Sequence, residues 1–297
     1  MNLAVQHVEG MDSRTTADEQ PMRVICVVDD AVQRSSPFWG EHGLAILIET
    51  EGKRLLFDTG QSGTVLLRNL GLLGVDPGTI DALAISHAHY DHTGGLPPLL
   101  EHLRPGTALY ANPDLFRERF SRKEGQPKDI GLGLTREQLA GRLAVKLSAA
   151  PAEILPGLWA TGEISARPEA EGKSAYHLMR EGGVLVADAY RDDMALVLDV
   201  GGRLALLCGC CHAGLLNTVA HVERTFEQPI AIIAGGLHLT SATPEDMQHI
   251  GEVLAAMPAL ERLYPNHCTG ESAFVALTQI LGPSVVCPCP AGTFLEL

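Results

Sequence analysis

The chain has 297 residues, 45% of them hydrophobic and 20% charged, which is enough apolar material for one large buried core. The formal net charge of −14 argues against a nucleic-acid-binding face and against electrostatic docking on an anionic membrane. No stretch reaches the roughly 20 apolar residues of a membrane span, and the N-terminus lacks the pattern of a secretory signal. We therefore expect a cytoplasmic protein with a flexible segment at 1–21.

The first third of the chain predicts several strands and one clear helix. Residues 22–30, MRVICVVDD, are rich in β-branched residues and predict a strand. Residues 44–60, LAILIETEGKRLLFDTG, predict a hairpin that turns at EGK. Apolar residues at helical spacing predict a helix at 64–75, and TIDALAIS at 79–86 predicts a short buried strand.

The middle of the chain is less regular. Residues 94–103 predict a helix with proline in its first turn, and 107–112 predict a strand. Residues 112–150 and 167–183 are polar and rich in turn residues, so we expect loop-rich insertions there, with one helix near 135–143.

The last third alternates strands with helices. We predict a hairpin at 193–211, strands at 229–238 and 260–268, helices at 217–226, 244–257 and 272–281, and a closing strand at 285–297. Thr243 should cap the second of these helices, with Pro244 at its first position. This order predicts an α/β fold of one domain at 22–297, in which two mixed sheets face each other with helices outside, a four-layer αββα sandwich.

A histidine-rich stretch, SHAHYDHTGGL at 86–96, follows the short buried strand. His87 and His89 are two residues apart in extended chain, so both imidazoles point the same way and can reach one ion. Asp91 and His92 follow at the start of the glycine turn, where they can face a second ion. Imidazole and carboxylate ligands suit zinc, with iron or Mn²⁺ as alternatives.

This stretch, together with LLFDTG before it and GCCHAG after it, resembles the metallo-β-lactamase-fold hydrolase superfamily over about residues 22–297. The segments EHGLAILIE, FDTGQSG, RDDMALVL, GGLHL and PNHCTG resemble one subfamily in particular. That subfamily is typified by the archaeal dihydropterin ribofuranosylaminobenzene-phosphate synthase and by bacterial metal-dependent hydrolases. The resemblance implies the αββα fold and a centre of one or two zinc ions.

The resemblance also assigns roles to residues. It implies two metal sites. The ligands of the first are His87, His89 and His212, and those of the second are Asp91, His92 and His267. It further implies that Asp58, in FDTG, orients a ligand histidine or the neighbouring turn. An ordinary strand-end cap is the alternative for Asp58.

One position departs from the family pattern. The superfamily usually places an aspartate between the two metals, after the strand that follows the third histidine, and here that strand ends in His238. A neutral imidazole does not bridge two cations as a carboxylate does. His238 is therefore predicted either to bind one metal or to face the substrate.

The seven cysteines include tight clusters and indicate a reduced chain rather than a disulfide framework. Cys208, Cys210 and Cys211 surround a predicted ligand on an apolar strand, and we expect them to be buried as small hydrophobic residues. Cys268 adjoins His267 and could tune the site or be oxidised.

Three polar groups have two interpretations each. Asp192 and Asp193 either hydrogen-bond near the metals or only begin a strand. Glu41 and His42 either line the same face or lie in a solvated loop. A basic cluster at 116–128 is either a solvated face, which we favour, or a lid that attracts a substrate phosphate or carboxylate; its members are Arg117, Arg119, Arg122, Lys123 and Lys128.

The function that follows is hydrolysis of a small, phosphorylated or cyclic ester by a metal-bound hydroxide. Asp91 would help to hold the water, and His238 would contact the oxyanion or relay a proton. Three alternatives stay open: a synthase-type transferase acting on a pterin precursor, a di-iron redox enzyme, and a non-catalytic metal or ligand sensor. We expect a small-molecule substrate and no nucleic-acid or membrane partner, while an oligomer stays open.

Overall fold

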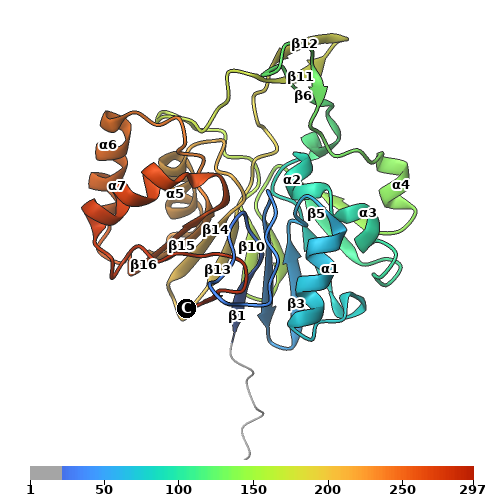
Figure 1. Ribbon diagram of the computed structural model, residues 1–297, viewed down its shortest axis with the longest axis horizontal. Coiled ribbons are helices and arrows are strands. Elements are labelled where there is room, and N and C mark those ends of the chain that lie inside the picture. The colour runs from blue at the N-terminus through green and yellow to red at the C-terminus, as the bar shows by residue number, and fades with distance from the viewer. Residues whose placement is uncertain (1–21) are drawn as a thin grey trace, which may run out of the picture.

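The computed structural model describes residues 22–297 and shows two large β-sheets packed face to face, with helices on both outer sides (Figure 1). This arrangement confirms the predicted α/β sandwich. The segment at 1–21, which we predicted to be flexible, lies outside the described residues. Among residues 22–297, no helix combines the length and the apolar character that crossing a membrane requires.

The first sheet has seven strands and contains the predicted hairpin at 44–60. In spatial order they are β17 (Phe294–Leu295), β1 (Arg23–Val28), β2 (Ala45–Thr50), β3 (Lys53–Phe57), β4 (Ala82–Ala84), β5 (Ala108–Ala111) and β8 (Ala144–Leu147). The neighbouring strands β3, β4, β5 and β8 run parallel to one another. The closing strand is shorter than predicted because Pro288 and Pro290 cannot donate to a sheet ladder.

The second sheet has six strands and contains the predicted hairpin at 193–211. In order they are β16 (Arg262–Asn266), β15 (Ile230–Gly236), β14 (Leu204–Cys208), β13 (Leu196–Asp199), β10 (Leu158–Ala160) and β9 (Ala152–Leu155). Strands β14, β15 and β16 are parallel, so their carboxyl ends lie at one edge.

The helices cover the outer faces of the two sheets (Figure 1). Those on the first sheet's side are α1 (Gly63–Leu72), α3 (Leu96–Leu99) and α4 (Arg136–Ala140), and those on the second sheet's side are α5 (Leu215–Phe226), α6 (Pro244–Ala255) and α7 (Glu271–Leu281). Thr243 caps α6, as predicted, by accepting a hydrogen bond from Asp246 N. The helix predicted at 94–103 is shorter than expected: it ends at Leu99, and the chain continues in turns over 100–102.

Short helical turns connect several strands to the next element. They are α2 (Tyr90–Thr93), η1 (Pro77–Thr79), η2 (Pro113–Phe116) and η3 (His267–Thr269). Two of them, α2 and η3, carry residues of the predicted metal centre.

A third, smaller sheet stands above one end of the sandwich (Figure 1). Its strands are β12 (Val184–Ala187), β11 (His177–Glu181), β6 (Arg119–Ser121) and β7 (Lys128–Asp129). Strands β6 and β7 lie in the first insertion that we expected to be loop-rich, β11 lies in the second, and β12 follows it directly. The two insertions therefore contain more regular structure than predicted. No local pattern predicts this sheet, because its strands are short and partly exposed and because β6 pairs with a strand more than 50 residues away.

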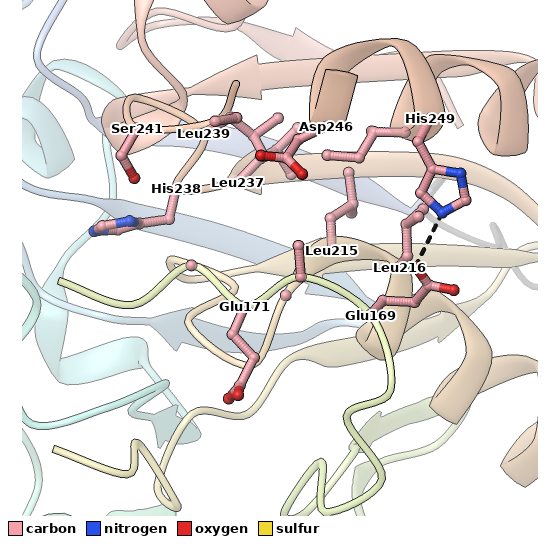
Figure 2. A pocket seen from close by; sticks show the side chains of 15 residues that line it. Glu169, Glu171, Leu215, Leu216, Leu237, His238, Leu239, Ser241, Asp246 and His249 are labelled. Atoms are coloured by element: carbon pink, nitrogen blue, oxygen red, sulfur yellow. Dashed lines mark hydrogen bonds and ion pairs between the residues drawn. The ribbon is translucent and has the colours of Figure 1, made fainter. Parts of the chain in front are cut away.

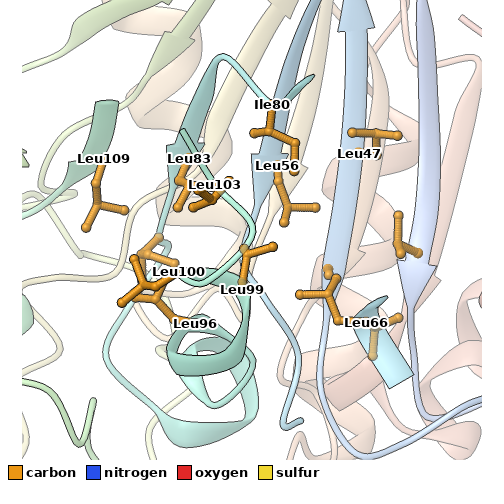
Figure 3. Close-up of a cluster of buried hydrophobic side chains, with 14 of the residues drawn as sticks. Leu47, Leu56, Leu66, Ile80, Leu83, Leu96, Leu99, Leu100, Leu103 and Leu109 are labelled. Carbon is orange, nitrogen blue, oxygen red and sulfur yellow. The ribbon is translucent and has the colours of Figure 1, made fainter. Parts of the chain in front are cut away.

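Apolar side chains fill three layers. One cluster joins the two sheets, one lies between the second sheet and helices α5 to α7, and one lies between the first sheet and its helices. Figure 3 shows the third cluster, in which Leu83 of β4 packs among leucines from neighbouring strands and from the 96–103 segment. Because β4 leads directly into the histidine-rich stretch, this cluster fixes the base of the predicted centre.

Replacing Leu83 should therefore destabilise the protein. Leu83→Ala leaves a cavity in a fully buried cluster, so we expect the free energy of unfolding to fall by about 2–5 kcal/mol. Leu72→Ala is the matched control, because Leu72 is 41% exposed and should change stability by no more than about 0.5 kcal/mol. Urea denaturation of the metal-free protein measures both, and equal effects would contradict the packing described here.

Candidate metal centre

The chemistry-bearing residues gather where strand ends meet, beneath the small sheet. Asp58 follows β3 and His87 follows β4, two neighbouring parallel strands of the first sheet. His212, His238 and His267 follow β14, β15 and β16, three neighbouring parallel strands of the second sheet. The sandwich therefore brings side chains that are up to about 200 residues apart in sequence to one edge of the fold.

The first predicted ligand set comes together. One nitrogen from each of His87, His89 and His212 lies within 4.8 Å of the others. His87 Nε2 is 3.0 Å from His89 Nδ1. His212 donates from Nδ1 to the carbonyl oxygen of Gly172 at 2.7 Å, while its buried Nε2 has no hydrogen-bond partner within residues 22–297. The second nitrogen of His212 is thus free to bind a cation.

The second predicted ligand set also comes together. Donor atoms of Asp91, His92 and His267 lie within 4.8 Å of one another. His92 Nε2 is 3.2 Å from His267 Nε2, which is 3.3 Å from Asp91 Oδ2. His267 Nδ1 lies 2.8 Å from Asp30 Oδ1, which leaves Nε2 to face the other two groups.

Asp58 holds both sets in place. Its Oδ1 accepts a hydrogen bond from Ser86 N, and its Oδ2 accepts one from Ser86 Oγ, each at 2.7 Å. His92 Nδ1 lies 2.7 Å from the same Oδ2. Since the Ser86 hydroxyl donates to Asp58, its oxygen accepts from His87 Nδ1 at 2.9 Å. The carboxylate therefore fixes tautomers that leave Nε2 unprotonated in His92 and in His87.

The electrostatics of the two sets differ. Burial lowers the pKa of His87, His89 and His212, which keeps these imidazoles in the neutral form that binds a cation. For His267, burial is outweighed by nearby Cys268 and by aspartates, so its pKa is raised. The second set therefore concentrates negative charge, and the first set does not.

Two aspartates of the RDDMA segment anchor the ligand loops. Asp192 Oδ2 accepts a hydrogen bond from Ala88 N at 2.9 Å, between the first two histidines. Asp193 Oδ2 accepts one from Ala213 N at 2.8 Å, next to His212. Burial raises the pKa of Asp193 to about 7. Both residues thus hydrogen-bond near the centre rather than only beginning a strand.

The basic cluster at 116–128 divides into two groups. Arg119 is 1% exposed and lies 2.9 Å from Asp188 Oδ2 and 2.6 Å from Asp192 Oδ1, so it links the small sheet to the ligand loops. Lys123 and Lys128 are exposed and line the cavity above the histidines. The solvated face that we favoured from the sequence fits the exposed Arg122, Lys123 and Lys128 but not the buried Arg119. Arg117 is half-buried and pairs with Asp114.

His238 lies beside the centre but outside each group of converging donor atoms found in the described chain. Its ring centroid is 4.3 Å from that of His212, and its buried Nδ1 has no hydrogen-bond partner among residues 22–297. Burial lowers its pKa to about 4. His238 also closes one end of a smaller cavity of about 80 Å³, with His249 at the other end (Figure 2). Ligation by His238 stays a prediction.

From the sequence, Cys210 was misassigned, Tyr190 was missed and the place of His42 stayed open. Cys210, expected to act as a small hydrophobic residue, lies with its Sγ 3.1 Å from His92 Nε2. Tyr190 stacks on His212 at 4.1 Å between ring centroids, and its hydroxyl is 2.9 Å from His177 Nδ1. His42 lies between Asp30 and Asp91. The ends of β1 and β14 were the available signal, because Asp30 and Cys210 directly follow those strands.

Backbone strain is concentrated in the same place. Eight non-glycine residues between 22 and 297 have a left-handed backbone, and five of them surround the centre: Asp58, Tyr190, Cys211, His238 and His267. Such conformations cost about 1–3 kcal/mol each and persist where the surroundings enforce them. Their clustering is typical of a functional site.

A cavity of about 300 Å³ opens above the histidines. His89, Asp91, His212 and His267 line its floor. Residues of the small sheet and its loops line the side opposite the floor. This volume suits a small molecule, and every substrate that enters the cavity meets both donor sets.

Comparison with known proteins identifies the family. The family model of the metallo-β-lactamase superfamily matches residues 39–193, which is more than half of the chain. The chain belongs to the metallo-β-lactamase superfamily. The resemblance inferred from the HAHYDH stretch and its companion motifs is thereby confirmed.

Individual relatives of this metallo-β-lactamase-fold protein agree with the assignment. The 7,8-dihydropterin-6-methyl-4-(β-D-ribofuranosyl)-aminobenzene-5'-phosphate synthase of Methanocaldococcus jannaschii is 30% identical over 269 residues, covering 85% of this chain and 89% of the relative. The crystal structure of Tm1679, a metal-dependent hydrolase of the β-lactamase superfamily, superposes with a TM-score of 0.79 at 27% identity, covering 93% of this chain and 99% of that one.

A third comparison bears on the fold alone. The structure of Zn²⁺-bound PqqB from Methylobacterium extorquens has a TM-score of 0.57 at 13% identity, covering 93% of this chain and 100% of that one. Proteins of this fold bind divalent metals, commonly zinc. The present chain fits such an ion, because unpaired imidazole nitrogens and a carboxylate converge in a buried pocket.

If Asp58 orients both ligand sets, removing its charge should weaken metal binding. We expect Asp58→Asn to raise the dissociation constant for zinc about 10–100-fold, because an amide has one acceptor oxygen and cannot accept all three hydrogen bonds from Ser86 and His92. Asp76→Asn is the control, since Asp76 only caps the remote turn η1. Competition with a chromophoric chelator measures both, and an unchanged affinity in Asp58→Asn would show that the contact is merely structural.

Proposed function

We propose that this protein is a metal-dependent hydrolase that acts on a small anionic ester, either phosphorylated or cyclic. The observation that carries the proposal is the meeting of two donor sets on the floor of one cavity. A divalent cation bound there supplies a water that is acidic near pH 7 and a Lewis acid for the ester oxygen. The chain's own residues must then hold the substrate and manage protons.

The two donor sets are close enough to act on the same bond. His87 of the first set and His92 of the second have ring centroids 4.2 Å apart. His87, His92 and Cys210 also have donor atoms within 4.8 Å of one another. This proximity supports a centre with two adjacent metal positions, as expected from the HAHYDH stretch.

Asp91 and His238 are the residues that we propose to act on water and substrate. The Asp91 carboxylate faces the cavity, 3.3 Å from His42 Nε2, so it can orient a water and hold its proton. His238 is neutral near pH 7, and its unpartnered Nδ1 is available to a substrate oxygen. We propose that His238 contacts the substrate rather than a metal.

The charge of the cavity mouth supports an anionic substrate. Lys123 and Lys128 line the cavity, with the single acidic Glu124 beside them, although the chain as a whole has a net charge of −14. Ammonium groups attract phosphate or carboxylate, and a locally positive entrance raises the concentration of anions at the site.

A synthase-type transferase is the second candidate. The 30% identity to the archaeal synthase, over 85% of this chain, favours it. The name of that relative's product contains a 5'-phosphate, a group that the two lysines would also suit. The two candidates differ in the acceptor, which is water for a hydrolase and a second organic substrate for a synthase.

Redox and sensing functions are less well supported. The first donor set consists of three imidazoles, with His89 where di-iron enzymes of this fold usually carry an acidic residue. Both donor sets converge beneath an open cavity, as a catalyst requires. Elemental analysis of the purified protein separates zinc from iron and so tests the redox alternative directly.

Hydrolysis should depend on the metal and on the first donor set. We expect the zinc-loaded protein to cleave at least one member of a panel of phosphomonoesters, phosphodiesters, cyclic phosphodiesters and lactones, with chelation abolishing the activity and zinc restoring it. His89→Ala should reduce the rate to background, whereas His102→Ala, a change at an exposed histidine, should not. Oxygen-18 from solvent water should appear in the product.

Two results would contradict the hydrolase proposal. One is activity that survives both chelation and His89→Ala. The other is turnover that requires a second organic substrate and incorporates no solvent oxygen, which would favour the synthase instead.

The lysines should affect substrate binding more than the chemical step. For an anionic substrate, Lys123→Ala and Lys128→Ala should each raise KM up to about fivefold, because an exposed charge pair contributes up to about 1 kcal/mol. The turnover number should stay nearly constant, and the effect should shrink at high salt. Lys53→Ala, on the distant β3, is the control. Equal losses for a neutral substrate would argue against charge recognition.

A further inference from the structure

Cys210 lies between the two donor sets. Its side chain is buried, with 3% of its surface exposed, and its Sγ is 3.1 Å from His92 Nε2. Its sulfur also belongs to two groups of converging donor atoms, one with His87 and His92 and the other with His267 and Cys268. No other cysteine among the described residues lies in both groups.

The neighbouring cysteines point elsewhere. Cys208 and Cys211 belong to the apolar cluster between the second sheet and helices α5 to α7. Cys210 instead lines the cavity above the metal centre. The chain therefore turns one thiol of the CGCC segment toward the centre and buries the other two in the core.

We propose that Cys210, as a thiolate, is a ligand of the second metal position, on the side that faces the first. This assignment rests on the metal centre proposed above but not on the reaction that it catalyses. It gives the centre an anionic ligand near the place where the family pattern has an aspartate and where a neutral His238 could not serve.

The distances fit tetrahedral coordination. Zinc bonds of about 2.0–2.1 Å to nitrogen and about 2.3 Å to sulfur place ligand atoms about 3.3–3.6 Å apart. The observed separations from His92 Nε2 are 3.1 Å to Cys210 Sγ, 3.2 Å to His267 Nε2 and 3.7 Å to Asp91 Oδ2. These values and the 3.3 Å between His267 Nε2 and Asp91 Oδ2 are close to the spacing of ligands around one ion, and His92 Nε2 adjoins each of the other three donors.

Charge balance favours the same assignment. Without Cys210, Asp91 is the single negatively charged donor of the two positions, and it must balance the charge of two divalent cations in a buried pocket. Loss of the thiol proton to solvent as the cation binds adds a second negative charge. A thiolate ligand also favours zinc, cobalt or iron over Mn²⁺ and Mg²⁺ at this position.

Cys268 has a supporting role in this arrangement. Its Sγ lies 3.3 Å from Cys210 Sγ, within hydrogen-bond distance for two sulfur atoms. Cys268 shares a donor group with one member of the second set, His267, whereas Cys210 also shares a group with His92. We assign Cys268 as a positioning residue. The alternative, in which Cys268 rather than Cys210 is the ligand, must be excluded by experiment.

Cobalt titration of the metal-free full-length protein tests the assignment by spectroscopy. A cobalt–thiolate bond produces an intense charge-transfer band in the near ultraviolet, which nitrogen and oxygen ligands do not produce. We expect the wild-type protein to bind two equivalents of Co²⁺ and to show this band. Cys210→Ser should lose the band, and Cys211→Ser, the matched control, should keep it. Cys268→Ser should also keep it.

A second variant guards against misfolding. Cys210→Asp replaces the thiolate with a carboxylate, so it should retain two equivalents of Co²⁺ while losing the band. Binding of one equivalent by Cys210→Ser, at the first position, serves as the internal check that this variant is folded.

Three results would overturn the assignment: a band that survives in Cys210→Ser, a band that disappears in Cys268→Ser alone, or two bound equivalents in the wild type without a band. Failure of the wild type to bind cobalt at all would overturn the metal centre itself. The two failures are therefore distinguishable.

Discussion

The carboxylate of Asp58 is the contact on which the centre depends most. It accepts hydrogen bonds from the backbone and hydroxyl of Ser86 and lies against His92 Nδ1, and Ser86 in turn holds His87. One buried anion thereby sets the orientation and tautomer of a histidine in each donor set. Because it lies at the end of β3, next to the end of β4, its position is fixed by the apolar cluster beneath the first sheet.

The second sheet supplies the other half of the centre, and buried polar contacts tie the halves together. Asp192 holds the backbone between His87 and His89, and Asp193 holds the residue after His212. Arg119 connects Asp192 to the small sheet through a buried ion pair. Removing one member of such a pair leaves an unpaired buried charge, which costs about 3–5 kcal/mol. These contacts connect the small sheet above the cavity to the ligand loops that form its floor.

The small sheet covers the site, and in the function proposed above it also contributes to selectivity. It places Lys123 and Lys128 over a centre made of imidazoles, carboxylate and thiol. A positive entrance on an acidic protein favours anionic substrates, and the cavity of about 300 Å³ limits their size. The hydrolase and synthase candidates share these requirements, so the choice between them depends on whether water or a second substrate receives the transferred group.

Local sequence patterns were enough to predict the sandwich, most of its hairpins and helices, and the four potential ligands in HAHYDH, because periodicity and spacing depend on neighbouring residues. The partnership of His212 and His267 with that stretch came from family resemblance. Three features became visible in the folded chain alone: Cys210 faces the centre, Arg119 is buried, and two polar insertions pair as a sheet. Those features depend on contacts between segments far apart in the chain, for which no local pattern exists.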